Sequence, residues 1–89
     1  MKIRFTEELW KEGNMYVSFA PELNISACGE TCDQARANLS EVVQINIEEM
    51  RKMGTLKGFL QEAGFELEGQ DMLSVKKELL EFQAREITV

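Results

Sequence analysis

The sequence has no histidine, two cysteines and a single proline in 89 residues. Histidine is the commonest general base and a frequent zinc ligand, so its absence argues against many catalytic and metal sites. Two cysteines are too few for the disulfide framework of a small secreted domain. No apolar run has the length of a membrane span or the pattern of a signal peptide. We therefore expect a cytoplasmic protein that binds no metal and no cofactor.

Basic charge is also scarce. The net charge is −6, and five of these six negative charges lie between Glu30 and Asp71. Phosphate backbones are bound by basic surfaces, whereas an acidic surface suits a basic protein partner. We expect no direct binding of nucleic acid. The acidity indicates either a basic partner or only a well-solvated surface.

The two cysteines, Cys28 and Cys32, lie four positions apart on either side of Gly29. A structural zinc site needs about four cysteine or histidine ligands, and thiol oxidoreductases use the spacing C-x-x-C. A cysteine hydrolase needs a base that this chain lacks. The one reactive possibility is Cys32, because a thiol at the start of a helix can have a lowered pKa. We interpret both as small packing residues and predict no catalytic residue and no enzyme activity.

The first thirty residues alternate in the manner of strands. Apolar residues recur at every second position in residues 2–10 and again after a Gly-Asn turn, where Met15, Val17 and Phe19 share a face. Glu7 interrupts the first run, which a bulge or an open edge would accommodate. Pro21 ends the second strand, and residues 23–28 form a third. The pattern predicts a three-stranded antiparallel meander.

A long helix is expected from residue 32 to residue 53. Thr31 and Gln34 have capping-box spacing, and Gly54 ends the helix. Its apolar stripe consists of Ala35, Leu39, Val42, Val43 and Met50, with Cys32 and Met53 at the ends. Asn46 lies within that stripe, either bonded to a loop or acting as a specificity device in helix packing. Ile45 is an apolar residue on the charged side, and we predict it to be an oligomer contact.

The last third of the chain begins with a shorter helix over residues 55–63, capped by Thr55. Residues 65–68 read as a strand followed by a turn. Residues 72–81 fit helical and extended spacing equally well, and residues 82–89 alternate with one slip of phase. We predict one α+β domain over residues 1–89.

The order of these elements, together with particular residues, resembles the HicB family of antitoxins. The matching stretch is GNMYVSFAPELNISACGETCDQARANL, residues 13–39. The elements that carry the resemblance are Tyr16, the run Pro21-Glu22-Leu23, the pair Cys28-Gly29, Thr31, Ala35, Asn38 and Leu39. A second stretch, MGTLKGFLQEAGFELEG at 53–69, is similar to the family's second helical segment. Asn24 departs from the acidic residue usual in the family, and Ala20 from the frequent cysteine.

The resemblance implies a partial ribonuclease-H-like fold, β-β-β-α and a closing strand, which would fall at residues 82–89. It also implies a function, the neutralisation of a small basic mRNA-cleaving toxin of the HicA type by covering its active site. Many members carry a further C-terminal DNA-binding domain, for which this sequence has no room, so we expect no operator binding. The alternative is a solo HicB-like module with a different partner and no toxin.

If a basic toxin is the partner, carboxylates and aromatic surface on rigid elements should meet it. We predict that the partner-binding residues are Tyr16, Glu22, Asn24, Glu30 and Asp33, lying next to one another. A three-stranded meander leaves edges exposed, and a second chain often covers such edges. We therefore also expect a homodimer or a higher homo-oligomer.

Overall fold

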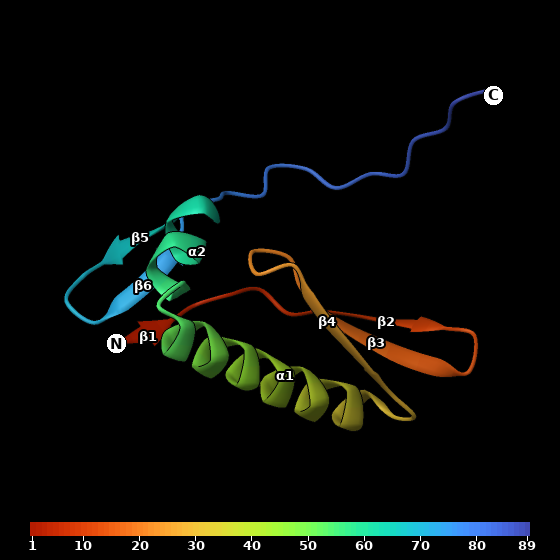
Figure 1. Cartoon of the computed structure of the whole chain (residues 1–89). Helices are drawn as coiled ribbons and strands as arrows, with labels where there is room; N and C mark the ends of the chain where they lie inside the picture. The colour runs from red at the N-terminus through yellow and green to blue at the C-terminus, as the bar shows by residue number, and fades with distance from the viewer.

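The computed structural model describes all residues, 1–89. In chain order the elements are β1 (Lys2–Ile3), β2 (Glu8–Glu12), β3 (Met15–Ala20), β4 (Ile25–Gly29), α1 (Cys32–Met53), α2 (Leu56–Glu62), β5 (Phe65–Glu68) and β6 (Met72–Val75). Figure 1 shows α1 lying along one side of the β2–β3–β4 sheet, with α2, β5 and β6 gathered near its C-terminal end. The predicted α+β class is confirmed. No helix is both long enough and apolar enough to cross a membrane.

The predicted meander is confirmed in strands β2, β3 and β4. The sheet order is β2-β3-β4, antiparallel throughout, and its register places Val17 between Trp10 and Cys28. The β2–β3 turn needs a left-handed residue, which Gly13 supplies with φ of 61°. Pro21 follows the last residue of β3, as expected of a residue that cannot donate to a ladder.

The first predicted strand is divided in two. Residues 4–7 separate β1 from β2, and β1 pairs in parallel with β6 in a second small sheet of order β1-β6-β5. Glu7, the residue that breaks the alternation, lies in this gap and forms an ion pair with Arg36 at 3.5 Å. The expected interruption is therefore a change of partner between two sheets.

Helix α1 has the predicted bounds. The Thr31 hydroxyl accepts a hydrogen bond from the Gln34 N–H at 3.0 Å, and the Gln34 side chain accepts one from the Glu30 N–H at 2.8 Å. Gly54, with φ of 74°, ends the helix in the left-handed conformation. Of the predicted stripe, Ala35, Leu39 and Val43 are buried, and Val42 and Met50 are half-buried.

Two positions of α1 and one of α2 differ from expectation. Met53 is 71% exposed, because the chain turns at Gly54 before this last side chain reaches the core. Asn46 is exposed and donates to the Val42 carbonyl of its own helix at 2.8 Å, so it lies outside the stripe. Thr55 precedes α2 but makes no side-chain capping bond to it; its hydroxyl lies 3.4 Å from the Met50 carbonyl of α1.

The C-terminal strand predicted at residues 82–89 is wrong in position. The strand near the C-terminus is β6, whereas residues 76–89 lie in no helix or strand. Figure 1 shows this segment leaving β6 and running away from the body of the molecule. We call residues 76–89 the C-terminal arm.

The hydrogen bonds of β1 explain why its ladder with β6 ends at Leu73. The Lys2 and Arg4 N–H groups donate to the Asp71 and Leu73 carbonyls, each at 2.8 Å. The next donor in this series is the Thr6 N–H, which instead donates to the Glu22 carboxylate at 2.9 Å. Glu22 therefore takes the donor that would have continued the ladder to the Val75 carbonyl.

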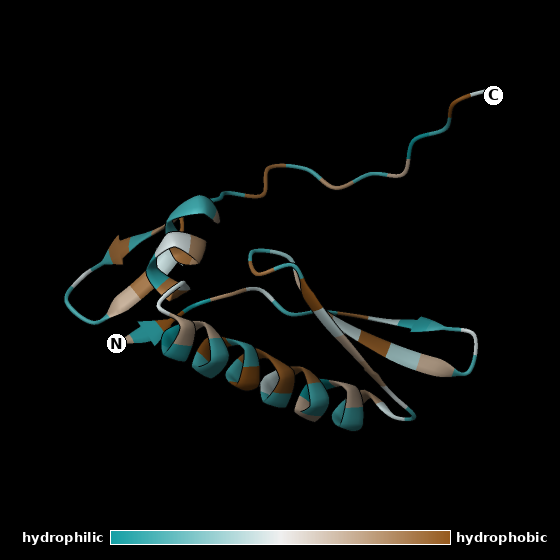
Figure 2. Ribbon diagram, in the orientation of Figure 1, coloured by the Kyte–Doolittle hydropathy of each residue, from teal (hydrophilic) through white to brown (hydrophobic).

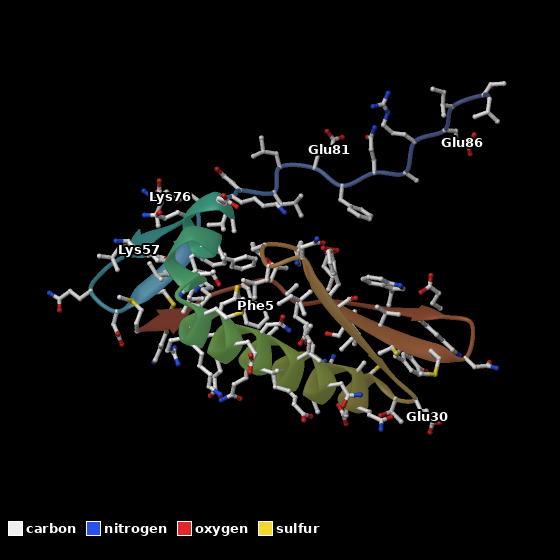
Figure 3. The ribbon with its side chains drawn as sticks, in the orientation of Figure 1. Phe5, Glu30, Lys57, Lys76, Glu81 and Glu86 are labelled. Atoms are coloured by element: carbon white, nitrogen blue, oxygen red, sulfur yellow. The ribbon has the colours of Figure 1, made fainter.

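The core lies between α1, the ends of β3 and β4, and the α2–β5 segment. Its buried members are Ala20, Leu23, Leu39, Val43, Leu60 and Phe65. Phe5 packs against this core from the segment between the two sheets and lies above the middle of α1 in Figure 3. The long helix thus holds both small sheets to one core.

Candidate partner-binding surface

Glu22, in the β3–β4 turn, is committed to contacts within the chain. Its carboxylate accepts hydrogen bonds from the Thr6 N–H at 2.9 Å and from the Thr6 hydroxyl at 2.6 Å. Partial burial raises the pKa of Glu22, but these bonds, its own N–H and the charge of Lys77 together lower that pKa below its ordinary value. This side chain links the β3–β4 turn to residues 4–7. Both of its carboxylate oxygens are already hydrogen-bonded, so they are less available to a partner.

Asn24 lies in the same turn for a conformational reason. It is the only non-glycine residue with positive φ, 55°, in the left-handed region. Asparagine tolerates this region better than most residues. The side chain is exposed, so it remains accessible to a partner.

Tyr16, Glu30 and Asp33 come together at the opposite end of β3. Tyr16 pairs with Gly29, the residue before Glu30, and Asp33 is in the first turn of α1. Glu12, at the end of β2, lies at the same end of the sheet because it pairs with Met15. We call Glu12, Tyr16, Glu30 and Asp33 the hairpin end; Figure 3 labels Glu30 there, far from Lys57 and Lys76.

The charges of the hairpin end are largely unpaired. Glu12 and Glu30 form no ion pair, and Asp33 contacts only Arg36, at 3.4 Å with its carboxylate 96% exposed. A second nearby cation is Lys11, whose Nζ lies 5.7 Å from the centre of the Tyr16 ring. The hairpin end is therefore an exposed acidic surface with an aromatic side chain beside it.

The structure thus divides the predicted set instead of joining it. Tyr16 and Ala20 mark the two ends of β3's pairing with β4, so Glu22 and Asn24 lie at the far end of the sheet from Glu30 and Asp33. The expectation that all five adjoin is wrong, because the helix begins where β4 ends, one strand length from the turn at which β4 starts. They form two groups: Glu22 is bound to Thr6, whereas the only side-chain bond of the hairpin-end carboxylates is the exposed Asp33–Arg36 contact.

Ile45, the predicted oligomer contact, is 53% exposed on α1. It lines a shallow hollow between α1 and the edge strand β4, together with Ser26, Ala27, Cys28, Asn38, Glu41 and Val42. The Asn38 side chain donates to the Cys28 carbonyl at 2.8 Å and so blocks part of this edge.

Both cysteines are free thiols: Cys28 is exposed and Cys32 is half-buried. No group of three or more histidine, cysteine, aspartate or glutamate side chains is arranged to hold a metal ion. The reading of both cysteines as packing residues fits Cys32, but Cys28 lies on the surface of β4.

Sequence reasoning did not single out the face of the β2–β3–β4 sheet that points away from α1. The register places Trp10, Met15, Val17, Phe19 and Cys28 on this face, which we call the open face. Trp10 and Phe19 make an edge-to-face contact with ring centres 6.2 Å apart. A signal was available, because Ser18, Ala20 and Ala27 at the intervening positions are small, as expected under a closely packed helix.

Comparisons with protein-family models, with curated proteins and with solved structures gave no match to this chain.

Proposed function

We propose that this protein is a HicB-like antitoxin that binds a small basic mRNA-cleaving toxin of the HicA type and covers its active site. The observation that carries the proposal is the hairpin end, where three exposed carboxylates lie at the same end of the sheet as Tyr16, that of Glu12 on the other face of the sheet. A basic toxin would be attracted by the carboxylates and would contact the tyrosine ring, whose hydroxyl makes no hydrogen bond within the chain.

The carboxylates are held in place by well-defined elements. Glu30 and Asp33 flank the capping box of α1, and Glu12 lies in a hairpin strand. Side chains on such elements lose little freedom when a partner binds, which favours affinity. The net charge of −6 adds long-range attraction for a basic partner.

The arrangement of elements also supports a HicB-like, partial ribonuclease-H-like relationship. A three-stranded meander is followed by a long helix, and a later strand, β6, returns to pair with β1. In this proposal the protein acts in the cytoplasm by protein–protein contact, without catalysis of its own and without touching nucleic acid directly. A duplex-DNA titration at moderate salt checks the last point: sub-micromolar, salt-sensitive binding would contradict it.

The experiment exchanges charge at the hairpin end. The double variant Glu30→Lys, Asp33→Lys should associate with a HicA-type toxin encoded beside this chain at least about tenfold more slowly, and should fail to protect cells from it. Glu48→Lys, Glu49→Lys is the matched control, since it makes the same charge change on exposed, unpaired residues of α1. Its association should slow much less.

A helix-end role for the same residues predicts the opposite pattern, because acidic side chains also stabilise a helix N-terminus by a few tenths of a kcal/mol. A lowered melting temperature with intact toxin neutralisation would overturn the proposed surface. Absence of any neighbouring gene for a short basic protein would instead favour the second candidate, a solo HicB-like binding module. The exposed apolar open face is the observation that favours that candidate.

A further inference from the structure

The middle of the open face is apolar, although the register also places Glu8, Glu12 and Ser26 on this face. Antiparallel sheets with one covered face normally turn polar residues outward. Here Trp10 is 40% exposed and Met15 38% exposed, and Val17 and Phe19 beside them are only half-buried. None of these residues belongs to the core that α1 covers. Exposed apolar patches of this kind mark interaction sites.

The C-terminal arm has the complementary properties. No main-chain hydrogen bond involves residues 76–89, and the arm exposes Leu79, Leu80, Phe82, Ile87 and Val89 by 73% or more. Figure 2 shows apolar residues recurring between polar ones along it. Its three basic and three acidic residues cancel, so it carries none of the net charge of −6 that repels a second copy. The arm is therefore a strand-like segment without a partner strand.

The edge available to such a strand is β2. The opposite edge, β4, is partly blocked by the Asn38–Cys28 hydrogen bond and by the α1 packing that Gly29 requires. No other strand pairs with the outer side of β2, and its Trp10 side chain borders the open face. Added strands bind such edges by main-chain hydrogen bonds and gain specificity from alternate side chains.

The copy's own arm pairs with no strand of its copy, although Leu79 and Phe82 border a hollow that Glu8 also lines. The arm could follow β6 along β1 and onto β2 only if the Thr6 N–H were free to continue the β1–β6 ladder. That N–H instead donates to the Glu22 carboxylate, so the ladder ends before β2 begins. Fourteen extended residues span roughly 45 Å, compared with 42 Å for the longest dimension of the whole molecule, so the arm can reach well into a neighbour. Figure 3 shows Glu81 and Glu86 on the arm, remote from the sheet of the same copy.

We propose that the arm of one copy adds to the β2 edge of a second copy and lays its apolar side chains on that copy's open face, with the second arm doing the same in return. The result is a closed dimer with twofold symmetry. The occupant of the open face is thus a segment of this same chain. This inference does not depend on the proposed antitoxin function, because no toxin takes part in it; of the hairpin end, only Glu12 lies on the β2 edge.

The test uses the purified full-length chain without any toxin. Sedimentation equilibrium should give twice the 10.2 kDa chain mass for the wild type. The arm variant Phe82→Asp, Ile87→Asp and the face variant Trp10→Asp should each weaken the dimer by at least about tenfold and sediment as monomers at low micromolar concentration. Ile45→Asp tests the competing contact predicted from the sequence, since it removes an exposed apolar residue of α1; if the arm forms the dimer, this variant should remain dimeric.

Mixing distinguishes exchange between copies from other arrangements. The arm variant keeps an intact face and the face variant keeps an intact arm, so an equimolar mixture should regain dimer through one arm–face contact. No association on mixing would mean that each arm folds onto its own copy, and would overturn the proposal. A dimeric arm variant, or a monomeric Ile45→Asp chain, would overturn it in favour of direct contact between faces or helices.

Circular dichroism and thermal unfolding show whether the variants are folded. The arm variant should unfold like the wild-type monomer, because the arm makes no main-chain bond within its own copy. Met15→Asp, at a position of the open face with similar exposure (38% against 40% for Trp10), replaces Trp10→Asp if the latter fails to fold. A monomeric wild type at about 100 μM would overturn the proposal outright.

Discussion

On one face of strand β3 the side chains are small and fully buried, whereas on the other face they are larger and partly exposed. Larger apolar side chains are usually the more buried ones, so this strand shows the opposite relation. Ser18 and Ala20, which face α1, are completely buried, whereas the larger Val17 and Phe19 on the open face are only half-buried. The residues most hidden in this strand are thus its smallest ones. Closeness of packing, and not the apolar surface of the side chain, decides which residues lie under the helix.

Gly29 shows how close this packing is. A Cβ atom added there would lie 2.7 Å from the Ala35 main-chain nitrogen and 2.9 Å from the Gln34 carbonyl carbon. Helix α1 therefore touches β4 almost backbone to backbone, and only small side chains fit between them. The large apolar residues of the meander are left for the open face, which is the surface we assign to a second copy.

The largest expected difference in the free energy of unfolding comes from comparing one Val→Ala substitution under the helix with one on the open face. Val43→Ala, in α1 at 5% exposure, should lower the free energy of unfolding by about 2 kcal/mol through lost burial and a residual cavity. Val17→Ala, on the open face, should lower it by less than about 1 kcal/mol at low micromolar concentration. Urea unfolding measures both.

The same pair also tests the dimer. If the open face is covered by a second copy, the effect of Val17→Ala should grow with protein concentration while that of Val43→Ala stays constant. Equal losses at every concentration would mean that both faces are buried within one copy.

The next largest effect is expected from glycine-to-alanine substitutions, which test how closely α1 packs on β4. Gly29→Ala should destabilise the fold by about 2 kcal/mol, because the new methyl group meets main-chain atoms that cannot move independently. Gly58→Ala is the matched control, since it lies within α2 with nothing inside 4 Å of the added atom. It should stabilise the protein by about 0.5–1 kcal/mol. Thermal unfolding should give shifts of opposite sign, and a neutral Gly29→Ala would contradict the close approach.

A smaller effect of the opposite sign is expected at Ser18. Its hydroxyl oxygen is buried without a hydrogen-bond partner, which is unfavourable. Ser18→Ala should therefore raise the free energy of unfolding by about 0.5–1 kcal/mol. Ser26→Ala, exposed on the neighbouring strand, should change it by much less. Destabilisation by Ser18→Ala would indicate that the hydroxyl has a partner in solution.

The smallest effect is expected at the β3–β4 turn, where polar bonds join β3 to residues 4–7. The pKa of Glu22 is lowered in the folded state, so the unfolded state takes up the proton first as the pH falls. The stability that this carboxylate contributes is complete above the ordinary pKa of glutamate, about 4.3, and is lost as the pH falls below it. Glu22→Gln should cost about 0.5 kcal/mol at neutral pH.

The measurement is the free energy of unfolding from about pH 6 to pH 3. The wild type should lose stability more steeply than Glu22→Gln at the acid end of this range. Glu66→Gln, at an exposed strand position, serves as the control and should follow the wild type. Parallel curves for wild type and Glu22→Gln would show that the Thr6–Glu22 bonds do not form in solution.

Local rules in the sequence were sufficient for much of the fold. The Thr31–Gln34 spacing and Gly54 gave both ends of α1, and Gly13 and Pro21 limited β3. Alternation also identified β5 correctly. It failed at residues 82–89, because alternation describes a segment able to form a strand and does not supply the neighbouring edge that makes it one.

The candidate site was predictable only in part, for a related reason. Glu30 and Asp33 were correctly placed at the start of the helix, and Tyr16 on the strand beside them. Glu22 carries the same charge as Glu30 but is bound to Thr6, sixteen residues away in the chain. A contact over that separation depends on how the turn folds back, which single-sequence patterns do not describe.

The sequence by itself determined the local elements of this protein, its acidity and the absence of histidine chemistry, because periodicity, caps and charge are properties of neighbouring residues. Only the tertiary structure decided which face of the meander the long helix covers, that β1 leaves the meander to pair with β6, and that the arm has no partner in its own copy. Those outcomes depend on the main-chain approach at Gly29 and on the single donor that Glu22 takes from Thr6. The first is a contact between the end of β4 and the first turns of α1, and the second joins residues sixteen positions apart. Their geometry exists only once the elements have packed.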